Sequence, residues 1–268
     1  MLGAAIRSEW YRTTRNRNLL FWAYGVIPLV YFALAATFDI SMVLQNGSPK
    51  DSDNLRMIAR VLNVAGNPVA HLFFAIGAAS IVADDYRWET WRLIVPRNGR
   101  RSLIAGKFLT YLMLVGLALV LTVIGDRFVA VAAGIVRGQV DWPSAQAVGQ
   151  ASAVFFAAWF ELGVLGAAVM FLAILTRSLL GAVIPAFLLS LTAAMGLDYL
   201  VPRRDAPWAL LAPGRAGEVV REWILPPSGV PMIRTETAAL AAISLFLWAV
   251  SALTLAILAF GRQDLSNE

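Results

Sequence analysis

Residues that could carry out chemistry are few in this chain, and their types exclude most enzyme classes. The 268 residues include one histidine, His71, and no cysteine. A single imidazole without thiols cannot build a histidine-based or thiolate metal site, and no cysteine nucleophile exists. The sequence also lacks a GxxxxGK[ST] nucleotide loop, an HExxH zinc motif and a GxSxG nucleophile turn. We therefore expect no enzyme, with no catalytic residue, metal or cofactor on this chain.

Glu161 is the most isolated charge in the sequence, because it lies near the middle of the apolar run 148–175. A carboxylate inside a membrane is either protonated or faces a bundle interior or a water-filled cavity. Two roles stay open for Glu161: lining a pathway, and forming structural hydrogen bonds. Gly163 and Gly166 beside it favour close approach of a neighbouring helix. His71 lies near the outer end of another apolar run, and we interpret it as an interfacial histidine in preference to a pH sensor or ligand.

Composition indicates that lipid surrounds most of the chain. The sequence is 59% hydrophobic and 15% charged, whereas soluble domains carry about 25% charged residues. Six apolar runs approach the length of about 20 residues that crosses a bilayer. We therefore expect an all-α polytopic membrane protein with six transmembrane helices in a single domain, 1–268. The expected spans are about 19–38, 64–83, 108–128, 148–175, 179–197 and 237–260.

The third apolar run is interrupted by two adjacent charges, Asp126 and Arg127. Either the span ends there, or a long helix continues to Val136 with both charges near its outer end. Adjacent residues do not face each other on a helix, so the two need not form an ion pair. We favour interfacial charges that reach the headgroups over a functional pair inside the membrane.

Two polar segments carry amphipathic patterns. In 1–18, Leu2, Ile6 and Trp10 recur every four residues, which favours a helix on the inner membrane surface over a plain basic flank. The proline-rich segment 198–236 is predicted to hold an outer amphipathic or re-entrant helix before the last span. Its apolar stripe comprises Val219, Val220, Trp223 and Ile224.

The segment 84–107 is long, charged and strongly basic, and it lies between the second and third apolar runs. Trp88, Trp91 and Val95 have the spacing of one helical face, which favours an interfacial helix. Lysine and arginine are roughly twofold denser on the side of the membrane that holds 84–107 and both termini. We therefore place these parts in the cytosol and the chain in the cytoplasmic membrane.

Three segments, in this order, resemble motifs of the permease subunits of ABC-2-type ABC transporters. SEWYRTTRNR at 8–17 is similar to the family's E-x-x-[KR]-x-x-R segment before the first span. YRWETWRLIVPRNGRRSLIAGK at 86–107 resembles its E-x-x-x-G-T…P-x-[SN]-x-R…GK segment between the second and third spans. There, Glu89 precedes Thr90 where the family often has glycine. FGRQDL at 260–265 is similar to its closing F-x-R-x-D.

The resemblance implies a dimeric permease driven by two separate ATPase subunits, which bind the ATP and magnesium. The loop after the second span would form a cytosolic coupling helix that docks on the ATPase, with the N-terminal helix beside it. The outer segment would cap the pathway. The implied ATPase-coupling contacts are Glu89, Thr90, Arg92, Arg97, Arg100 and Arg101. The implied contacts of the interfacial N-terminal helix are Glu9, Arg12 and Arg15.

Two functions from different classes therefore stay open. An export permease predicts ABC ATPase partners, a second permease copy of the same or another chain, and contact with membrane lipid. A non-transporting scaffold or regulatory anchor predicts instead that the basic loop binds anionic lipid or another cytosolic protein. The excess of positive charge follows from membrane topology, so we expect no nucleic-acid partner.

Overall fold

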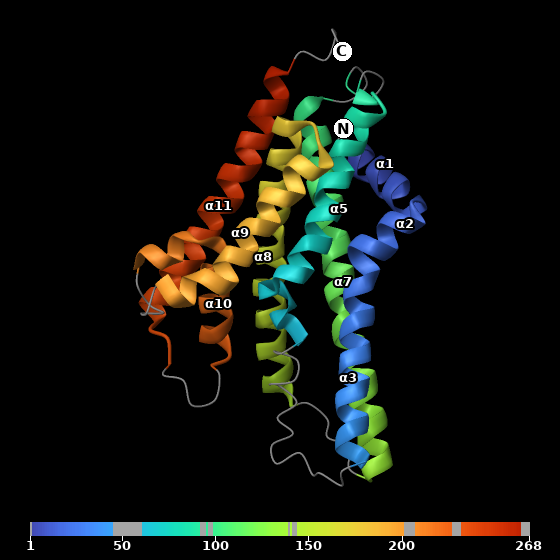
Figure 1. The fold of residues 1–268 in the computed structure, drawn as a ribbon, viewed down its shortest axis with the longest axis vertical. Helices are drawn as coiled ribbons and strands as arrows, with labels where there is room; N and C mark the ends of the chain where they lie inside the picture. Colours follow the sequence, from blue (N-terminus) through green and yellow to red (C-terminus); the bar gives the residue numbers. More distant parts are fainter. Residues whose placement is uncertain are drawn as a thin grey trace.

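The computed structural model of the chain is a bundle of helices (Figure 1). It describes residues 2–44, 61–91, 95, 99–138, 140, 144–200, 207–226 and 232–263, and it has no strand in these ranges. The elements are α1 (Leu2–Arg15), α2 (Arg17–Leu20), η1 (Phe21–Gly25), α3 (Val26–Leu44), η2 (Asn63–Gly66), α5 (Pro68–Arg87), α7 (Arg100–Arg137), α8 (Ala145–Thr176), α9 (Leu179–Leu200), η3 (Pro207–Leu211), α10 (Pro213–Ile224) and α11 (Thr235–Arg262).

Five helical stretches within the described ranges are long and apolar enough to cross a membrane, which indicates a multi-pass membrane protein. They are Arg17–Ser41, Pro68–Arg87, Arg100–Arg137, Ala145–Thr176 and Thr235–Arg262. Five of the six predicted spans thus correspond to helices of membrane length. In α9, the apolar stretch Leu179–Ala194 is shorter, and a sixth crossing by this helix stays a prediction.

The helices α5 and α8 form the centre of the bundle. Their apolar stretches are 67% and 61% buried, against 22% for α11, which turns most of its surface outwards. Tyr111 of α7 and Phe74 of α5 are fully buried, and the Tyr111 hydroxyl donates to the carbonyl oxygen of Leu162 at 3.0 Å. A Cβ atom at Gly166 would collide with the Tyr111 ring. Glycine therefore permits the close helix approach that the sequence suggests.

Local sequence signals set several helix ends. The Asn67 side chain accepts hydrogen bonds from the first turn of α5, and Pro68 occupies the position where no backbone N–H is required. Ser144 begins α8 in the same way, through its hydroxyl oxygen. Gly138 ends α7 with a φ of 72°, in the left-handed region that favours glycine.

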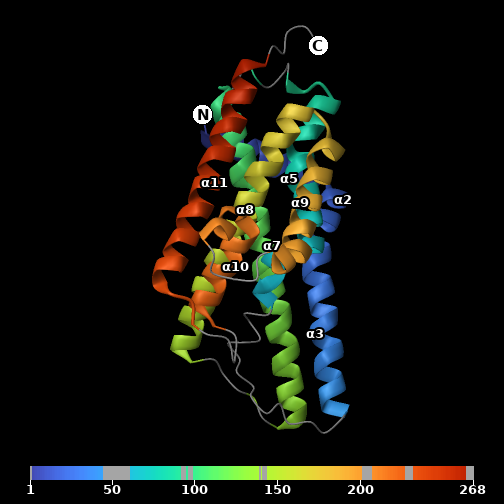
Figure 2. The same ribbon diagram turned by 60° about the vertical axis from the view of Figure 1, so that its left-hand side comes forward.

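The helix α7 is continuous over 38 residues and extends past the predicted span 108–128 at both ends. Its rise of about 57 Å exceeds the full thickness of a bilayer, about 40–45 Å. The long-helix alternative is therefore the one observed, with α3 packed beside α7 (Figures 1 and 2). Asp126 lies about 28 Å from Lys107 along the helix by helical rise, towards the C-terminal end of α7. Arg127 does form an ion pair with Asp126, at 2.6 Å.

The residues of α1 that are buried within the protein are not those of its apolar stripe. Leu2 and Trp10 are exposed, whereas Ala5, Glu9 and Thr13 are buried. The helix packs along α7, at the end of the bundle where α11 also ends (Figure 1). The apolar stripe of α1 therefore remains available to lipid, and its polar stripe is bound within the protein.

In the segment 198–236, which was predicted to lie outside, α10 packs against α8 and α11 (Figure 2). Val219 of the predicted apolar stripe is buried, but Trp223 is exposed. The buried residues of α10 also include Arg215, Gly217 and Arg221. The segment 198–236 thus holds a helix within the described residues, and charged side chains of this helix turn inwards together with Val219.

Candidate functional site

A buried ion cluster joins α1, α5 and α7 at the end of the bundle where α1 and the end of α11 lie. Lys107 of α7 is fully buried, and its Nζ lies 2.6 Å from Asp85 Oδ2 and 3.0 Å from Glu9 Oε1. The same nitrogen donates to the carbonyl oxygen of Ile81 at 2.7 Å. Two ion pairs and one hydrogen bond to a carbonyl oxygen thus surround the buried ammonium group.

Arg12 contributes the second cation of this cluster. It pairs with Asp85 and, at 3.0 Å, with Glu9, and it donates to the carbonyl oxygen of Ile81 at 3.1 Å. Burial acts to lower the pKa of Arg12, but the two carboxylates raise that pKa by more, so the guanidinium stays charged. The Thr90 hydroxyl also donates to Asp85, at 2.5 Å. Two carboxylates thus balance two cations, which offsets much of the desolvation cost.

Gly106 lets α1 approach α7 closely enough for these ion pairs. A Cβ atom at Gly106 would lie 3.0 Å from Ala5 Cβ and 3.2 Å from the Ala5 carbonyl carbon. The adjacent residue Lys107 then meets Glu9 one turn along α1. The Gly-Lys pair that closes the second resembling segment therefore has a physical role in joining the two helices.

The end of α11 is bound to the same end of the bundle. Arg100 Nη1 donates to three carbonyl oxygens at the last turn of α11: those of Phe260 (3.3 Å), Gly261 (2.9 Å) and Gln263 (2.8 Å). A cation at a helix C-terminus is favoured, because the exposed carbonyl groups carry partial negative charge. The Gln263 side chain accepts from the Tyr86 hydroxyl at 2.6 Å. Sequence reasoning assigned no role to Gln263 or Tyr86.

Trp91 fills the space between the ion cluster and α11. Its side chain is buried, with ring centroids 5.6 Å from Tyr86 and 4.4 Å from Phe260. Lys107 Nζ lies 5.1 Å from the centroid of the Trp91 ring, a distance suited to a cation–π contact. The aromatic contacts therefore link the cluster to the last helix.

The structure separates the residues that the sequence grouped as ATPase contacts. Thr90 belongs to the buried cluster, and Arg100 binds the end of α11. Arg101 is exposed at the start of α7. Arg15 is also exposed, and it donates to the Tyr11 hydroxyl at 2.6 Å. Glu9 and Arg12, predicted as contacts of the interfacial N-terminal helix, lie within the ion cluster.

The segment between α5 and α7 differs from the predicted interfacial helix. Residues 88–90 form a turn in which Glu89 has a φ of 51°. Trp88 is 68% exposed and Trp91 is 2% exposed, so these two do not share one face. Both ends of the predicted loop 84–107 belong to the flanking helices. The predicted contacts Arg92 and Arg97 lie outside the described residues.

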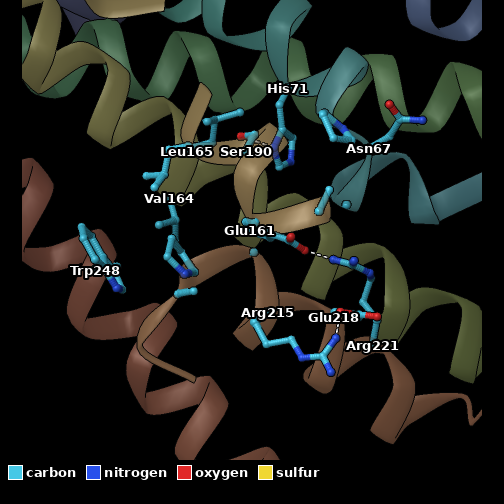
Figure 3. A pocket seen from close by; sticks show the side chains of 18 of the residues that line it. Asn67, His71, Glu161, Val164, Leu165, Ser190, Arg215, Glu218, Arg221 and Trp248 are labelled. Atoms are coloured by element: carbon cyan, nitrogen blue, oxygen red, sulfur yellow. Dashed lines mark hydrogen bonds and ion pairs between the residues drawn. The ribbon is translucent and has the colours of Figure 1, made fainter. Parts of the chain in front are cut away.

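A second candidate site is a cavity of about 1120 Å³, which we call the outer cavity because α10 of the predicted outer segment lines it (Figure 3). Residues of η2, α5, α8, α9, η3, α10 and α11 line it. Apolar side chains such as Leu165, Leu172 and Leu189 form much of the wall. The charged lining residues are Glu161, Arg215, Glu218, Arg221 and Glu222.

Glu161 forms a buried ion pair with Arg221 in the wall of this cavity (Figure 3). Burial lowers the pKa of Arg221 to about 10, which still leaves it charged at neutral pH. Two glycines give the pair its space: a Cβ atom at Gly217 would collide with the Glu161 carboxylate, and one at Gly66 would lie 2.8 Å from Arg221 Nη2. Glu161 therefore faces the bundle interior, and its counterion comes from α10.

His71 also lines the cavity, and it is buried within the bundle. Its Nε2 donates to the carbonyl oxygen of Ala65, since a carbonyl oxygen can only accept. Its Nδ1 shares a hydrogen bond of 2.7 Å with the Ser190 hydroxyl of α9. Both ring nitrogens are therefore used to hold η2 and α9 beside α5.

Neither a comparison with protein-family models nor one with curated proteins gives a match for this chain. The class of the protein therefore rests on the helices, which define a multi-pass membrane protein.

Proposed function

We propose that this chain is the membrane-spanning permease subunit of an ATP-driven ABC exporter of the ABC-2 type. The observation that supports the proposal best is the meeting of three segments that resemble that family. Arg12 from the first segment pairs with Asp85 next to the second. Arg100 from the second binds the carbonyl oxygens of Phe260 and Gly261 in the third. Segments that lie far apart in the sequence thus form one connected end of the bundle.

The contacts at this end are suited to transmit movement. A partner that displaced α1 or the segment after α5 would act on α7 directly, through Lys107 and its two carboxylates. The continuous helix α7 would carry the displacement to the outer side. A partner can shift such an equilibrium only by binding two arrangements of the bundle differently. In the proposal, closure of the two ATPase subunits on binding ATP and magnesium provides that difference.

Exposed residues at the same end offer a surface for the ATPase. Trp88 is 68% exposed, and the Arg87 guanidinium lies 5.2 Å from the centroid of its ring. Arg101 is exposed at the start of α7, and Arg15 is exposed at the end of α1. Tryptophan and arginine are enriched at protein interfaces, where they contribute much of the binding energy. In the proposal this surface faces the cytosol.

The proposal also includes the topology of the chain in the membrane. In it, α9 crosses the membrane as a sixth span, both termini lie in the cytosol, and the protein is located in the cytoplasmic membrane. A second permease copy, identical or related, would complete the pathway. The outer segment with α10 would cover that pathway.

Copurification tests the proposal directly. The tagged chain would be expressed in its host and extracted in mild detergent, and its partners identified by mass spectrometry. We expect a protein with a GxxxxGK[ST] loop whose ATP hydrolysis changes when the chain is present. Arg101→Glu should reduce the recovery of this partner, because it reverses a charge on the proposed docking surface. Arg234→Glu is the matched control, since Arg234 is exposed at the start of α11, at the opposite end of the bundle.

Two outcomes would contradict the proposal. The first is the absence of any nucleotide-binding partner, together with binding to vesicles that depends on anionic lipid, as expected of a regulatory anchor. The second is equal loss of the partner in Arg101→Glu and Arg234→Glu, which would show that the docking surface is wrongly placed.

A further inference from the structure

We propose that the outer cavity binds a zwitterionic amphiphile, a molecule whose head carries one anionic group and one ammonium group and whose body is apolar. The size of the cavity is the first reason. Its volume of about 1120 Å³ exceeds that of most sites for drug-sized ligands, about 300–1,000 Å³. Leu165, Leu172 and Leu189 supply apolar wall for a body of lipid dimensions.

The charges on α10 are the second reason. Arg215, Glu218 and Arg221 are each three residues apart on α10 and alternate in sign. Their axial separation is about 4.5 Å per step. Arg215 Nη1 pairs with Glu218 Oε2 at 2.5 Å, so a ligand head would meet this pair together with Arg221. A purely anionic or purely cationic head would meet a like charge one step away. A head with both charges a few bonds apart can face an arginine and a glutamate together.

The ion pair at the cavity wall is the third reason. Glu161 and Arg221 are buried and pair with each other, but Glu161 Oε1 and Arg221 Nε have no hydrogen-bond partner among the described residues. One atom is an unsatisfied acceptor and the other an unsatisfied donor. An ammonium group near Glu161 and an anionic group near Arg221 would replace one internal ion pair with two. Figure 3 shows the two side chains meeting within this wall.

The rim of the cavity indicates how an amphiphile would reach it. Trp208, Leu211, Leu189 and Trp248 line the cavity and are exposed. Large exposed apolar side chains on a membrane protein face lipid, and tryptophan favours the depth of the headgroups. Trp248 Nε1 donates to the carbonyl oxygen of Leu211 at 2.8 Å, which holds the two together at the rim. The ligand would therefore enter sideways, from the bilayer.

Binding to the purified full-length chain tests this inference. Lauroyl lysophosphatidylethanolamine is the zwitterionic probe, lauroyl lysophosphatidylglycerol the anionic one and dodecylamine the cationic one, each titrated in a neutral detergent and followed by native mass spectrometry. We expect saturable binding of the zwitterionic probe, at least tenfold tighter than that of the other two. Equal partition of all three probes, or tighter binding of a singly charged one, would overturn the proposal.

Variants test separately the apolar part of the cavity, which would hold the body of the ligand, and its charged part, which would hold the head. Ala168→Phe fills the apolar part of the cavity and should weaken the zwitterionic probe at least tenfold. Ala239→Phe, on the exposed surface of α11 and away from the cavity, is the matched control and should leave binding unchanged. Glu218→Gln should remove the preference for the zwitterionic over the anionic probe. Unaltered binding in Ala168→Phe would place the amphiphile elsewhere.

Binding of the amphiphile to the chain alone is independent of the proposed ATPase coupling. If the ATPase partner is absent but the zwitterionic probe binds, the proposed function fails and the site stands. If the partner copurifies but the probes partition equally, the site fails and the proposed function stands.

Discussion

Lys107 Nζ lies 2.6 Å from Asp85 Oδ2, in a place from which the lysine side chain has no contact with solvent. Glu9 and Arg12 complete the cluster, so that its charges balance. The cluster joins the first helix of the chain to α5 and α7, which are close neighbours at this end. Its net neutrality depends on every member, and three of the four charges, those of Lys107, Asp85 and Glu9, are held away from water, whereas the Arg12 side chain is 39% exposed.

Replacing Lys107 with methionine should be strongly destabilising. The substitution leaves two buried carboxylates against one cation, and breaking a buried ion pair in this way costs about 3–5 kcal/mol. We expect lower yield and a lower midpoint of thermal unfolding in detergent, followed by size-exclusion fluorescence. Arg101→Met on the same helix removes an exposed cation and should change the midpoint little.

Replacing both Lys107 and Asp85 with neutral residues distinguishes the effect of unbalanced charge on stability from the effect of lost packing. Lys107→Met combined with Asp85→Asn removes one charge of each sign, and it should recover part of the stability that the single variant loses. A double variant no more stable than Lys107→Met would show that loss of packing, and not the unbalanced charge, causes the effect.

Glu161 and Arg221 should behave as a coupled pair. Glu161→Gln leaves the buried guanidinium of Arg221 without its counterion, which costs about 3–5 kcal/mol. Adding Arg221→Gln should restore much of the loss, because neither charge is then left alone. A double-mutant cycle of unfolding midpoints measures the coupling, and additive losses would contradict a direct interaction. If transport is established, intact transport in Glu161→Gln would assign this residue to packing.

The contact between α7 and α8 at Gly166 gives a steric prediction. A methyl group there collides with the Tyr111 ring, which is fully buried, and overpacking of a core costs about 1–3 kcal/mol. Gly166→Ala should therefore lower the unfolding midpoint. Gly149→Ala, on the same helix with no atom near its added Cβ, should raise stability slightly because alanine favours helix. The same midpoint in both variants would contradict close packing at Gly166.

Hydropathy was sufficient to find the long helices, because the bilayer imposes a length on each apolar run. It could not find the partners of the charged residues. Glu9 meets Lys107 across nearly a hundred residues of sequence, and Glu161 meets Arg221 from the outer segment. One chain without observed covariation contains no signal that pairs these positions. A chemical clue was nevertheless present, since a lone intramembrane carboxylate requires a counterion or a proton.

Apolar spacing alone does not identify the face that packs against protein where a helix has both lipid and protein as neighbours. On α1 the apolar stripe of Leu2 and Trp10 is exposed, and the polar residue Glu9 is buried. The apolar stripe of a helix is the face that avoids water, and in a membrane protein that face can contact lipid as well as protein. The same reasoning explains why α10 turns Arg215 and Arg221 towards the cavity.

Glu89 gives the last prediction, because its φ of 51° lies in the left-handed region that costs an ordinary residue about 1–2 kcal/mol. Glycine adopts this conformation without strain, and the resembling family often has glycine before the threonine. Because the Glu89 side chain makes contacts of its own, we compare the stabilities of Glu89→Gly and Glu89→Ala with each other and not with the native chain.

Both variants lose these side-chain contacts, and only glycine relieves the backbone strain. After allowing for the greater freedom of glycine in the unfolded chain, Glu89→Gly should be the more stable by about 0.5–1 kcal/mol. A higher unfolding midpoint for the alanine variant would show that the turn at 88–90 does not hold this conformation.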